Sequence, residues 1–269
     1  MRRLLIRPGG IGDCILSLPA LEHLKTDYTE VWVRSEIVPL IRFADRVCPI
    51  ASSGLDLAGL PGVDPPVPLL ERLRQFDSIV SWYGANRPEF REHVQALGLP
   101  FHFLTALPPA AGMHAADFFL HQAGGEGMAV PRIECVPDER RDAIVIHPFS
   151  GSVRKNWPLE KYRELAQQLP WPVEWCAGPE EALEGAVRFS SLWDLARWLA
   201  GARMYIGNDS GITHLAAAVE TPVLAIFVST DSAVWAPRGR HVHVVDGAMQ
   251  PHALGMRVAE LFRGSGPRV

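Results

Sequence analysis

The stretch "LLIRPGGIGDCILSLPAL", residues 4–21, joins a short apolar run, a glycine-rich turn and a longer apolar run. The first run, Leu4–Ile6, has the length of a buried strand, and the run from Cys14 to Leu24 is long enough for a helix. A glycine-rich turn that leads from a strand into a helix is typical of doubly wound α/β domains. One carboxylate, Asp13, stands at the junction, a place where phosphate-binding loops usually avoid negative charge.

Two roles are open for Asp13 on this stretch alone. An aspartate at a helix start caps backbone N–H groups and suits the positive end of the helix dipole. A carboxylate held on a rigid turn can also act as a general base. The glycines Gly9, Gly10 and Gly12 do not form G-x-G-x-x-G and no Walker lysine follows, so neither of those nucleotide-binding motifs is indicated.

The rest of the first half alternates between short apolar runs and amphipathic stretches, which predicts a parallel sheet covered by helices. The expected strands are Val31–Arg34, Val47–Ala51, Ser78–Trp82 and Phe101–Leu104. The expected helices are Ile37–Ala44, Leu69–Phe76, Glu89–Leu97 and Ala115–Ala123.

The second half repeats this alternation. Its expected strands are Ala143–His147, Val173–Cys176, Met204–Ile206, Val223–Phe227 and Val242–Val245. Its expected helices are Leu159–Leu169, Leu192–Leu199, Ile212–Val219 and Leu254–Phe262. We therefore predict an α/β protein of two doubly wound, Rossmann-like domains, residues 1–124 and 142–269, joined by a linker over 125–141. Ligands are expected at the carboxyl ends of the strands, in a cleft that the domains face.

Composition narrows the class of protein. The 269 residues are 48% hydrophobic and 21% charged, and the net charge of −4 indicates no general affinity for nucleic acid. The four cysteines have no C-x-x-C spacing, which favours reduced thiols in a cytosolic protein. Neither a secretory leader nor an apolar run of membrane-spanning length is recognisable. We expect a cytoplasmic protein, and peripheral contact with the inner face of the membrane stays open.

The loop "HPFSGSVRKNWP", residues 147–158, offers small donors beside a positive charge. Hydroxyl and backbone N–H groups next to a lysine suit a diphosphate, which needs charge neutralisation and close approach. We expect such contacts from Ser150, Gly151, Ser152 and Lys155. A polar loop with a solvated lysine is the alternative.

The segment "GNDSGITHLAAA", residues 207–218, opens another helix with small and polar residues. Free backbone N–H groups at such an entrance form an anion site. The expected phosphate contacts are Asp209, Ser210, Gly211 and His214. Alternatively, Asp209 is a plain N-cap and His214 is a buried structural histidine.

Two further turns follow strands. In "AGPEE", residues 177–181, we expect a strand-to-helix turn in which Glu180 or Glu181 accepts hydrogen bonds from ribose hydroxyls, or serves as a first-turn acid. In "VSTDS", residues 228–232, helix capping by Thr230 or Asp231 is favoured. No set of His, Cys or acidic residues has metal-ligand spacing, and D-x-D is absent.

Three segments together resemble glycosyltransferase family 9, the ADP-heptose:lipopolysaccharide heptosyltransferases. They are "GGIGDCILSLPAL", "HPFSGSVRKNWPLEKYRELAQQL" and "YIGNDSGITHLAAAVETPVLAIF". The resemblance implies a GT-B fold, with the acceptor in the first domain and a nucleotide-sugar donor in the second. It also implies inverting transfer without a metal or other cofactor.

The resemblance also assigns roles. Asp13 would be the general base, in an acceptor loop with Gly10 and Gly12. Glu181 would bind the ribose, with Glu180 beside it. The donor diphosphate would lie against Ser150, Gly151, Ser152, Lys155, Asp209, Ser210, Gly211 and His214. Val228–Ser232 stands where the family commonly has Gly-Pro-Thr-Asp-Pro.

The implied partners are a nucleotide-diphosphate sugar, with ADP-heptose as the first candidate, and a saccharide or glycolipid acceptor, with a monomer as the default. Two other functions fit the same architecture: a nucleotide-sugar epimerase or hydrolase, which needs no acceptor, and a catalytically weak nucleotide-sugar-binding protein. A carboxylate at position 13 argues against the binding protein, because binding needs no base.

Overall fold

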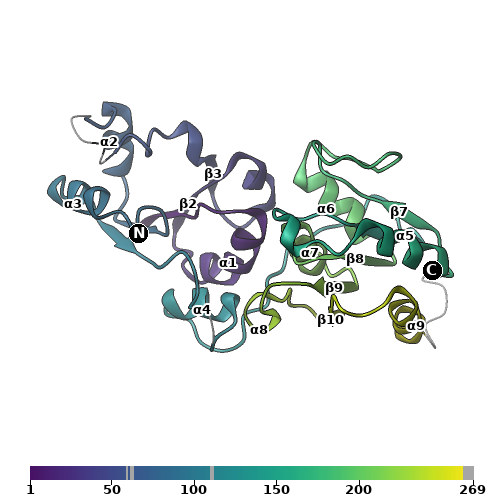
Figure 1. Ribbon diagram of the computed structural model, residues 1–269. Helices are drawn as coiled ribbons and strands as arrows, with labels where there is room; N and C mark the ends of the chain where they lie inside the picture. The colour runs from purple at the N-terminus through teal and green to yellow at the C-terminus, as the bar shows by residue number, and fades with distance from the viewer. Residues whose placement is uncertain (59, 61–63, 110–111, 263–269) are drawn as a thin grey trace. The chain divides into compact units, whose positions relative to one another are not determined.

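The computed structural model describes residues 1–58, 60, 64–109 and 112–262, and it divides into two compact units, Met1–Ala129 and Val130–Val269. Each unit has a five-stranded parallel sheet with helices on both faces (Figure 1). This confirms the predicted α/β class with two Rossmann-like domains.

The first unit has the strand order β3-β2-β1-β4-β5, as in Rossmann domains. Its strands are β1 (Arg2–Ile6), β2 (Tyr28–Val33), β3 (Arg46–Pro49), β4 (Ser78–Ser81) and β5 (Phe101–Phe103). Its helices are α1 (Ile11–His23), α2 (Val67–Leu73), α3 (Pro88–Ala96) and α4 (Ala115–Gln122), with 3-10 turns η1 (Ser35–Leu40) and η2 (Ile50–Ser52).

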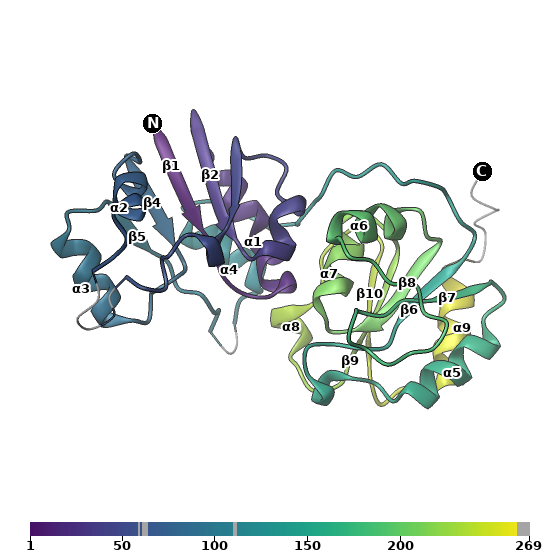
Figure 2. The ribbon, with the colours of Figure 1, turned by 90° about the horizontal axis from the view of Figure 1, so that it is seen from above.

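The core of the first unit follows from the alternation of side chains along β1. Leu4 and Ile6 point to the face that packs against Leu69 of α2 and Phe90 of α3, and all four side chains are buried. The neighbouring Leu5, also buried, points to the opposite face. Helix α1 packs against α4, and the two lie side by side in both ribbon views (Figures 1 and 2).

The second unit has the order β7-β6-β8-β9-β10, the flavodoxin-like arrangement. Its strands are β6 (Ile144–His147), β7 (Val173–Trp175), β8 (Met204–Asn208), β9 (Val223–Phe227) and β10 (Val242–Asp246). Its helices are α5 (Leu159–Gln168), α6 (Leu192–Ala200), α7 (Gly211–Ala218), α8 (Ser232–Trp235) and α9 (Pro251–Leu261), with the 3-10 turn η3 (Val153–Lys155). Helices α5 and α9 pack side by side on one face (Figure 2), over Ile144 and Ile146.

The strand orders locate one switch point in each sheet. The order reverses between β1 and β4 in the first unit and between β6 and β8 in the second. Loops that leave neighbouring strands in opposite directions open a crevice there, which is where open α/β sheets bind ligands. The turn with Asp13 follows β1, whereas the loops with Lys155 and Asp209 follow β6 and β8.

One expected helix and one expected strand-to-helix turn are corrected. Ile37–Ala44 is not an α-helix: the segment forms the 3-10 turn Ser35–Leu40, which contains Pro39 and ends before the expected boundary. The turn "AGPEE" does not lead directly into a helix: Val187 first pairs with the edge of β7, its N–H donating to the Trp175 carbonyl at 2.8 Å and its carbonyl accepting the Ala177 N–H at 3.1 Å, and the next helix is α6.

Within the part of the chain that the structure describes, no helix combines the length and apolar character required to cross a membrane.

Candidate functional site

The Asp13 carboxylate forms a hydrogen bond within the first turn of α1, although Asp13 is not the N-cap of that helix. Gly10 occupies the N-cap position and the helix begins at Ile11, so Asp13 is the third helical residue. Its Oδ2 atom accepts the Gly10 N–H at 2.9 Å. The simple N-cap alternative is therefore wrong, but the carboxylate still pairs an N–H group at the positive end of the helix.

The glycines of this turn have different tasks. Gly9 has φ +115°, and a Cβ there would lie 3.0 Å from Asp13 Oδ2, so only glycine fits without strain. Gly10 supplies the N–H that holds Asp13. Gly12 lies in the first turn of α1. The acceptor role of Gly10 and Gly12 stays a prediction.

Arg7 lies beneath the turn and was not anticipated as part of the site. Its guanidinium is buried and donates to the carbonyls of Pro8 and Asp13, at 2.7 and 3.2 Å, and to the Ser17 hydroxyl at 2.7 Å. Ser17 in turn donates to the Asp13 carbonyl at 2.7 Å. Burial lowers the pKa of Arg7, with Cys14 and Asp13 opposing that shift. The signal for this role was a charged residue directly after the apolar run Leu4–Ile6.

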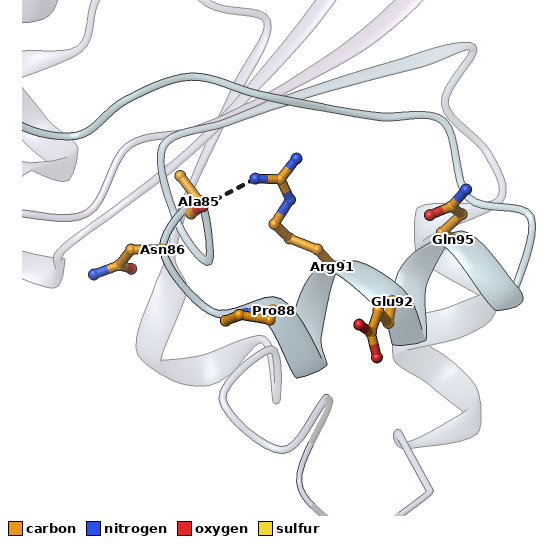
Figure 3. A pocket seen from close by; sticks show the side chains of 6 residues that line it. All are labelled: Ala85, Asn86, Pro88, Arg91, Glu92 and Gln95. Atoms are coloured by element: carbon orange, nitrogen blue, oxygen red, sulfur yellow. Dashed lines mark hydrogen bonds between the residues drawn. The ribbon is translucent and has the colours of Figure 1, made fainter.

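A separate pocket of about 320 Å³ lies on α3 of the first unit (Figure 3). Its lining residues are Ala85, Asn86, Pro88, Arg91, Glu92 and Gln95. The Arg91 guanidinium donates to the Ala85 carbonyl at 3.3 Å, and it lies over the Phe103 ring. The pocket combines one cation, one carboxylate and two amides, so its charge does not by itself select an anion.

In the second unit, Lys155 and Asp209 meet at the switch point. The Lys155 Nζ atom donates to Asp209 Oδ2 at 2.7 Å, and the Thr230 hydroxyl donates to the same oxygen at 2.7 Å. His214 Nε2 lies 3.9 Å from the other oxygen, Oδ1. Asp209 and His214 are buried, whereas about a third of the Lys155 side chain is exposed. The lysine is thus held by a buried carboxylate while it still faces solvent.

Thr230 was expected to serve only in helix capping. Asp231 does cap α8, accepting the Ala233 N–H at 2.8 Å, but Thr230 reaches back to Asp209 instead. The loops after β6, β8 and β9 therefore converge on one carboxylate. Loop spacing along the chain contains no signal for that convergence.

Ser150 belongs to a partly buried polar network within the loop. Its hydroxyl lies 2.7 Å from Asn156 Oδ1 and 2.8 Å from the Ser152 carbonyl. Asn208, fully buried, accepts from the Trp157 N–H and the Tyr162 hydroxyl at 2.8 and 2.9 Å. This network fixes the start and end of the loop. Gly151 is exposed, and a Cβ there would meet open space.

The entrance of α7 differs in detail from the expectation. Ser210, not Asp209, is the N-cap, and its hydroxyl accepts the Thr213 N–H at 3.3 Å. The N-cap alternative for Asp209 is therefore wrong, and the Thr213 N–H is already paired. The N–H groups of Gly211 and Ile212 remain at the positive end of the helix, where they suit an anion.

Glu180 and Glu181 are adjacent in the sequence but lie in different environments. Glu181 Oε2 accepts the Gly178 N–H at 2.6 Å and lies 3.1 Å from His147 Nε2. Glu180 is exposed. Neither is a first-turn acid, because no helix begins there. His147, at the end of β6, was not singled out from the sequence.

Comparison with known proteins identifies the family. The model of glycosyltransferase family 9 (heptosyltransferase) matches residues 120–257, which is more than half of the chain. The chain belongs to glycosyltransferase family 9.

Curated members of the family align over part of their length. Lipopolysaccharide heptosyltransferase 1 of Pseudomonas aeruginosa is 34% identical over 190 residues, which are 60% of this chain and 52% of that protein. Lipopolysaccharide heptosyltransferase 1 of Escherichia coli K12 is 30% identical over 132 residues, 48% of this chain and 36% of that protein. The chain thus spans about half or less of the length of these relatives.

Solved structures support the fold over nearly the whole chain. An Escherichia coli heptosyltransferase determined with ADP has a TM-score of 0.68 at 19% identity, covering 97% of this chain and 100% of that one. A family 9 glycosyl transferase from Veillonella parvula has a TM-score of 0.75 at 15% identity, covering 98% and 97%. At these identities, the likeness shows the GT-B fold and no more.

The family 9 match includes every predicted donor residue and leaves Asp13 outside its limits. Among the described residues, no group of three or more His, Cys, Asp or Glu side chains could hold a metal ion.

Proposed function

We propose that this family 9 member is an inverting, metal-independent glycosyltransferase. It moves a sugar, with heptose as the first candidate, from an ADP-type nucleotide-diphosphate donor to a hydroxyl of a saccharide or lipopolysaccharide-core-like acceptor. The observation that carries the proposal is the cluster of Lys155, Asp209 and Thr230 at the switch point of the second unit. It lies inside the matched family region.

The donor chemistry follows from this cluster. An ammonium group has three N–H donors, and Asp209 takes one of them, so Lys155 keeps donors for phosphate oxygens. The Gly211 and Ile212 N–H groups add the positive end of α7. Both stabilise the charge that gathers on the diphosphate as it leaves. In this proposal they do what a divalent cation does in other phosphate-transfer sites.

Asp13 has the complementary task in the proposal. Its carboxylate takes the proton of the acceptor hydroxyl while that oxygen forms its bond to the anomeric carbon. The bond between the anomeric carbon and the diphosphate oxygen breaks in the same step, and the nucleotide diphosphate leaves with the bonding electrons. A single displacement of this kind inverts the anomeric configuration.

The acceptor and its location complete the proposal. A glycolipid acceptor would bring the enzyme to the inner face of the membrane as a peripheral protein. A saccharide acceptor would be free of the membrane. No cofactor is assigned, and a monomer suffices.

Nucleotide binding tests the donor half. ADP, GDP and UDP are titrated calorimetrically into the wild type, Lys155→Met and the control Lys25→Met, an exposed lysine of the first unit. ADP should bind the wild type and the control equally, and about tenfold or more weakly to Lys155→Met. Equal affinity in all three proteins, or no nucleotide binding to the wild type, would contradict the proposal.

Product analysis tests the reaction class. ADP-heptose is incubated with the enzyme, with and without a lipopolysaccharide-core acceptor, and the anomeric configuration is determined by NMR. Transfer with inversion supports the proposal. Conversion of the donor without acceptor identifies a hydrolase or epimerase, and binding without turnover identifies a binding protein.

A further inference from the structure

Buried His147 and partly exposed Glu181 form a pair that the proposed reaction does not use directly. His147 ends β6, is 3% exposed, and places Nε2 3.1 Å from Glu181 Oε2. The loop carrying Glu181 follows β7, the neighbour of β6 in the sheet. Arg188 fixes this loop further by donating to the Glu181 and Leu183 carbonyls at 2.8 and 2.9 Å.

The proton on His147 can be placed by its surroundings. Burial acts to raise the pKa of Glu181, but hydrogen bonds from His147 and the Gly178 N–H outweigh it, so the pKa lies below its ordinary value. An ionised carboxylate only accepts, so His147 Nε2 carries the proton and donates. His147 Nδ1 is buried and has no hydrogen-bond partner among the described residues. A protonated Nδ1 would be an unpaired buried donor, so the hydrogen bonding favours the proton on Nε2.

This arrangement leaves the two oxygens of Glu181 unequal. Oε2 receives both donors, from His147 and from Gly178. No described side chain or backbone group is seen to donate to Oε1, and the Glu181 side chain is partly exposed. Gly178 is close enough that an added Cβ would lie 3.3 Å from the carboxylate carbon, so glycine allows the short contact. The carboxylate is therefore fixed on one side and open on the other.

We propose that His147 is a positioning residue that makes the donor site selective for ribose hydroxyls. It holds Glu181 by Oε2, so that Oε1 accepts from the ribose of the bound nucleotide. The inference rests on the proposed function, in which the second unit binds a nucleotide diphosphate. Exposed Glu180, held by no such pair, is not assigned this task.

The test compares ADP with 2′,3′-dideoxy-ADP, which lacks both ribose hydroxyls. Affinities are measured by calorimetry for the wild type, Glu181→Ala, His147→Leu and His147→Gln. Leucine removes the donor, whereas the glutamine side-chain amide can replace Nε2–H. The wild type should prefer ADP by about tenfold or more, since hydrogen bonds to charged groups are strong. His147→Leu and Glu181→Ala should bring the two affinities within about threefold, and His147→Gln should restore the preference.

The outcomes separate the inference from the proposed function. A wild type that binds neither nucleotide contradicts the proposed function. A wild type that binds both equally, or a His147→Leu variant that keeps the preference for ADP, overturns the inference alone. Weaker binding of both nucleotides by the same factor indicates a purely structural role and also overturns it.

A measurement on the wild type covers the case in which His147→Leu does not fold. Imidazole ¹⁵N shifts, with His147 assigned through the glutamine variant, should show a protonated Nε2 and a bare Nδ1. ADP should move the Nε2 signal, and 2′,3′-dideoxy-ADP should leave it in place. A protonated Nδ1, or equal shifts with both nucleotides, contradicts the inference.

Discussion

At the residue scale, the turn around Asp13 is built to hold one carboxylate in one place. The Gly10 N–H binds its Oδ2 atom, and the buried Arg7 binds its carbonyl. A base gains from such fixation, because proton transfer needs the acceptor atom within hydrogen-bond reach of the substrate. The same contacts also serve the start of the helix, so structure and proposed chemistry do not compete at this position.

Gly9→Ala should destabilise the protein by about 1–3 kcal/mol, because alanine is strained at a positive φ and its Cβ would crowd Asp13. Gly151→Ala is the matched control, since a Cβ there meets open space, and it should change the unfolding free energy little. Urea denaturation of both variants measures the difference. Equal stability of the two would show that the turn is not held as described.

Buried thiols make the protein sensitive to alkali. Burial raises the pKa of Cys14 and of Cys176 to about 12, from the ordinary thiol value of 9.0. Since the unfolded chain ionises these thiols first, stability is present below pH ~9 and is lost as the pH rises toward 12. Each thiol should contribute a slope of about −1.4 kcal/mol per pH unit within that window.

Urea melts between pH 9 and 11 measure this slope, and Cys176→Ala should make it shallower. In the native protein at pH 8, iodoacetamide should modify the partly exposed Cys48 and Cys135 before Cys14 and Cys176. Rapid labelling of Cys176 without unfolding would contradict its assigned burial.

At the element scale, most strands and helices could be predicted from apolar periodicity, because each buries one face on its own sheet. The exceptions have local physical causes. Pro39 accompanies a 3-10 turn where a helix was expected, and Val187 pairs with the edge of β7, which the composition of "AGPEE" does not reveal. Contacts between loops, such as Thr230 with Asp209 and His147 with Glu181, depend on strand order and could not be derived from spacing.

Ser210 caps α7 and is also a predicted contact of the donor diphosphate, and Ser210→Ala should separate these two functions. Loss of an N-cap hydroxyl costs about 1 kcal/mol of stability. Ser191, the N-cap of α6, accepts the Trp193 N–H at 3.1 Å and provides a matched control. Both alanine variants should lose similar stability, but only Ser210→Ala should weaken ADP binding. Weaker ADP binding by Ser191→Ala to the same extent would mean that general destabilisation explains the effect.

At the scale of the whole molecule, each unit has its own sheet and its own buried core. The predicted donor residues all lie in the second unit, whereas Asp13 lies in the first. A ligand stabilises the unit that it binds, by about 2.7 kcal/mol at 100 times its dissociation constant. Scanning calorimetry should therefore show that ADP raises the midpoint temperature of one unfolding transition and leaves that of another unchanged. Equal shifts of all transitions would contradict a donor site confined to the second unit.

In the proposed reaction, Asp13 activates the acceptor while the second unit holds the donor. Asp13→Asn tests it most directly, because the amide oxygen can still accept the Gly10 N–H but cannot take a proton. Transfer from ADP-heptose to a lipopolysaccharide-core acceptor is measured beside ADP affinity. Transfer should fall by about 10²- to 10⁴-fold, with ADP affinity unchanged within about twofold. Transfer at the wild-type rate would contradict the role of Asp13 as the base.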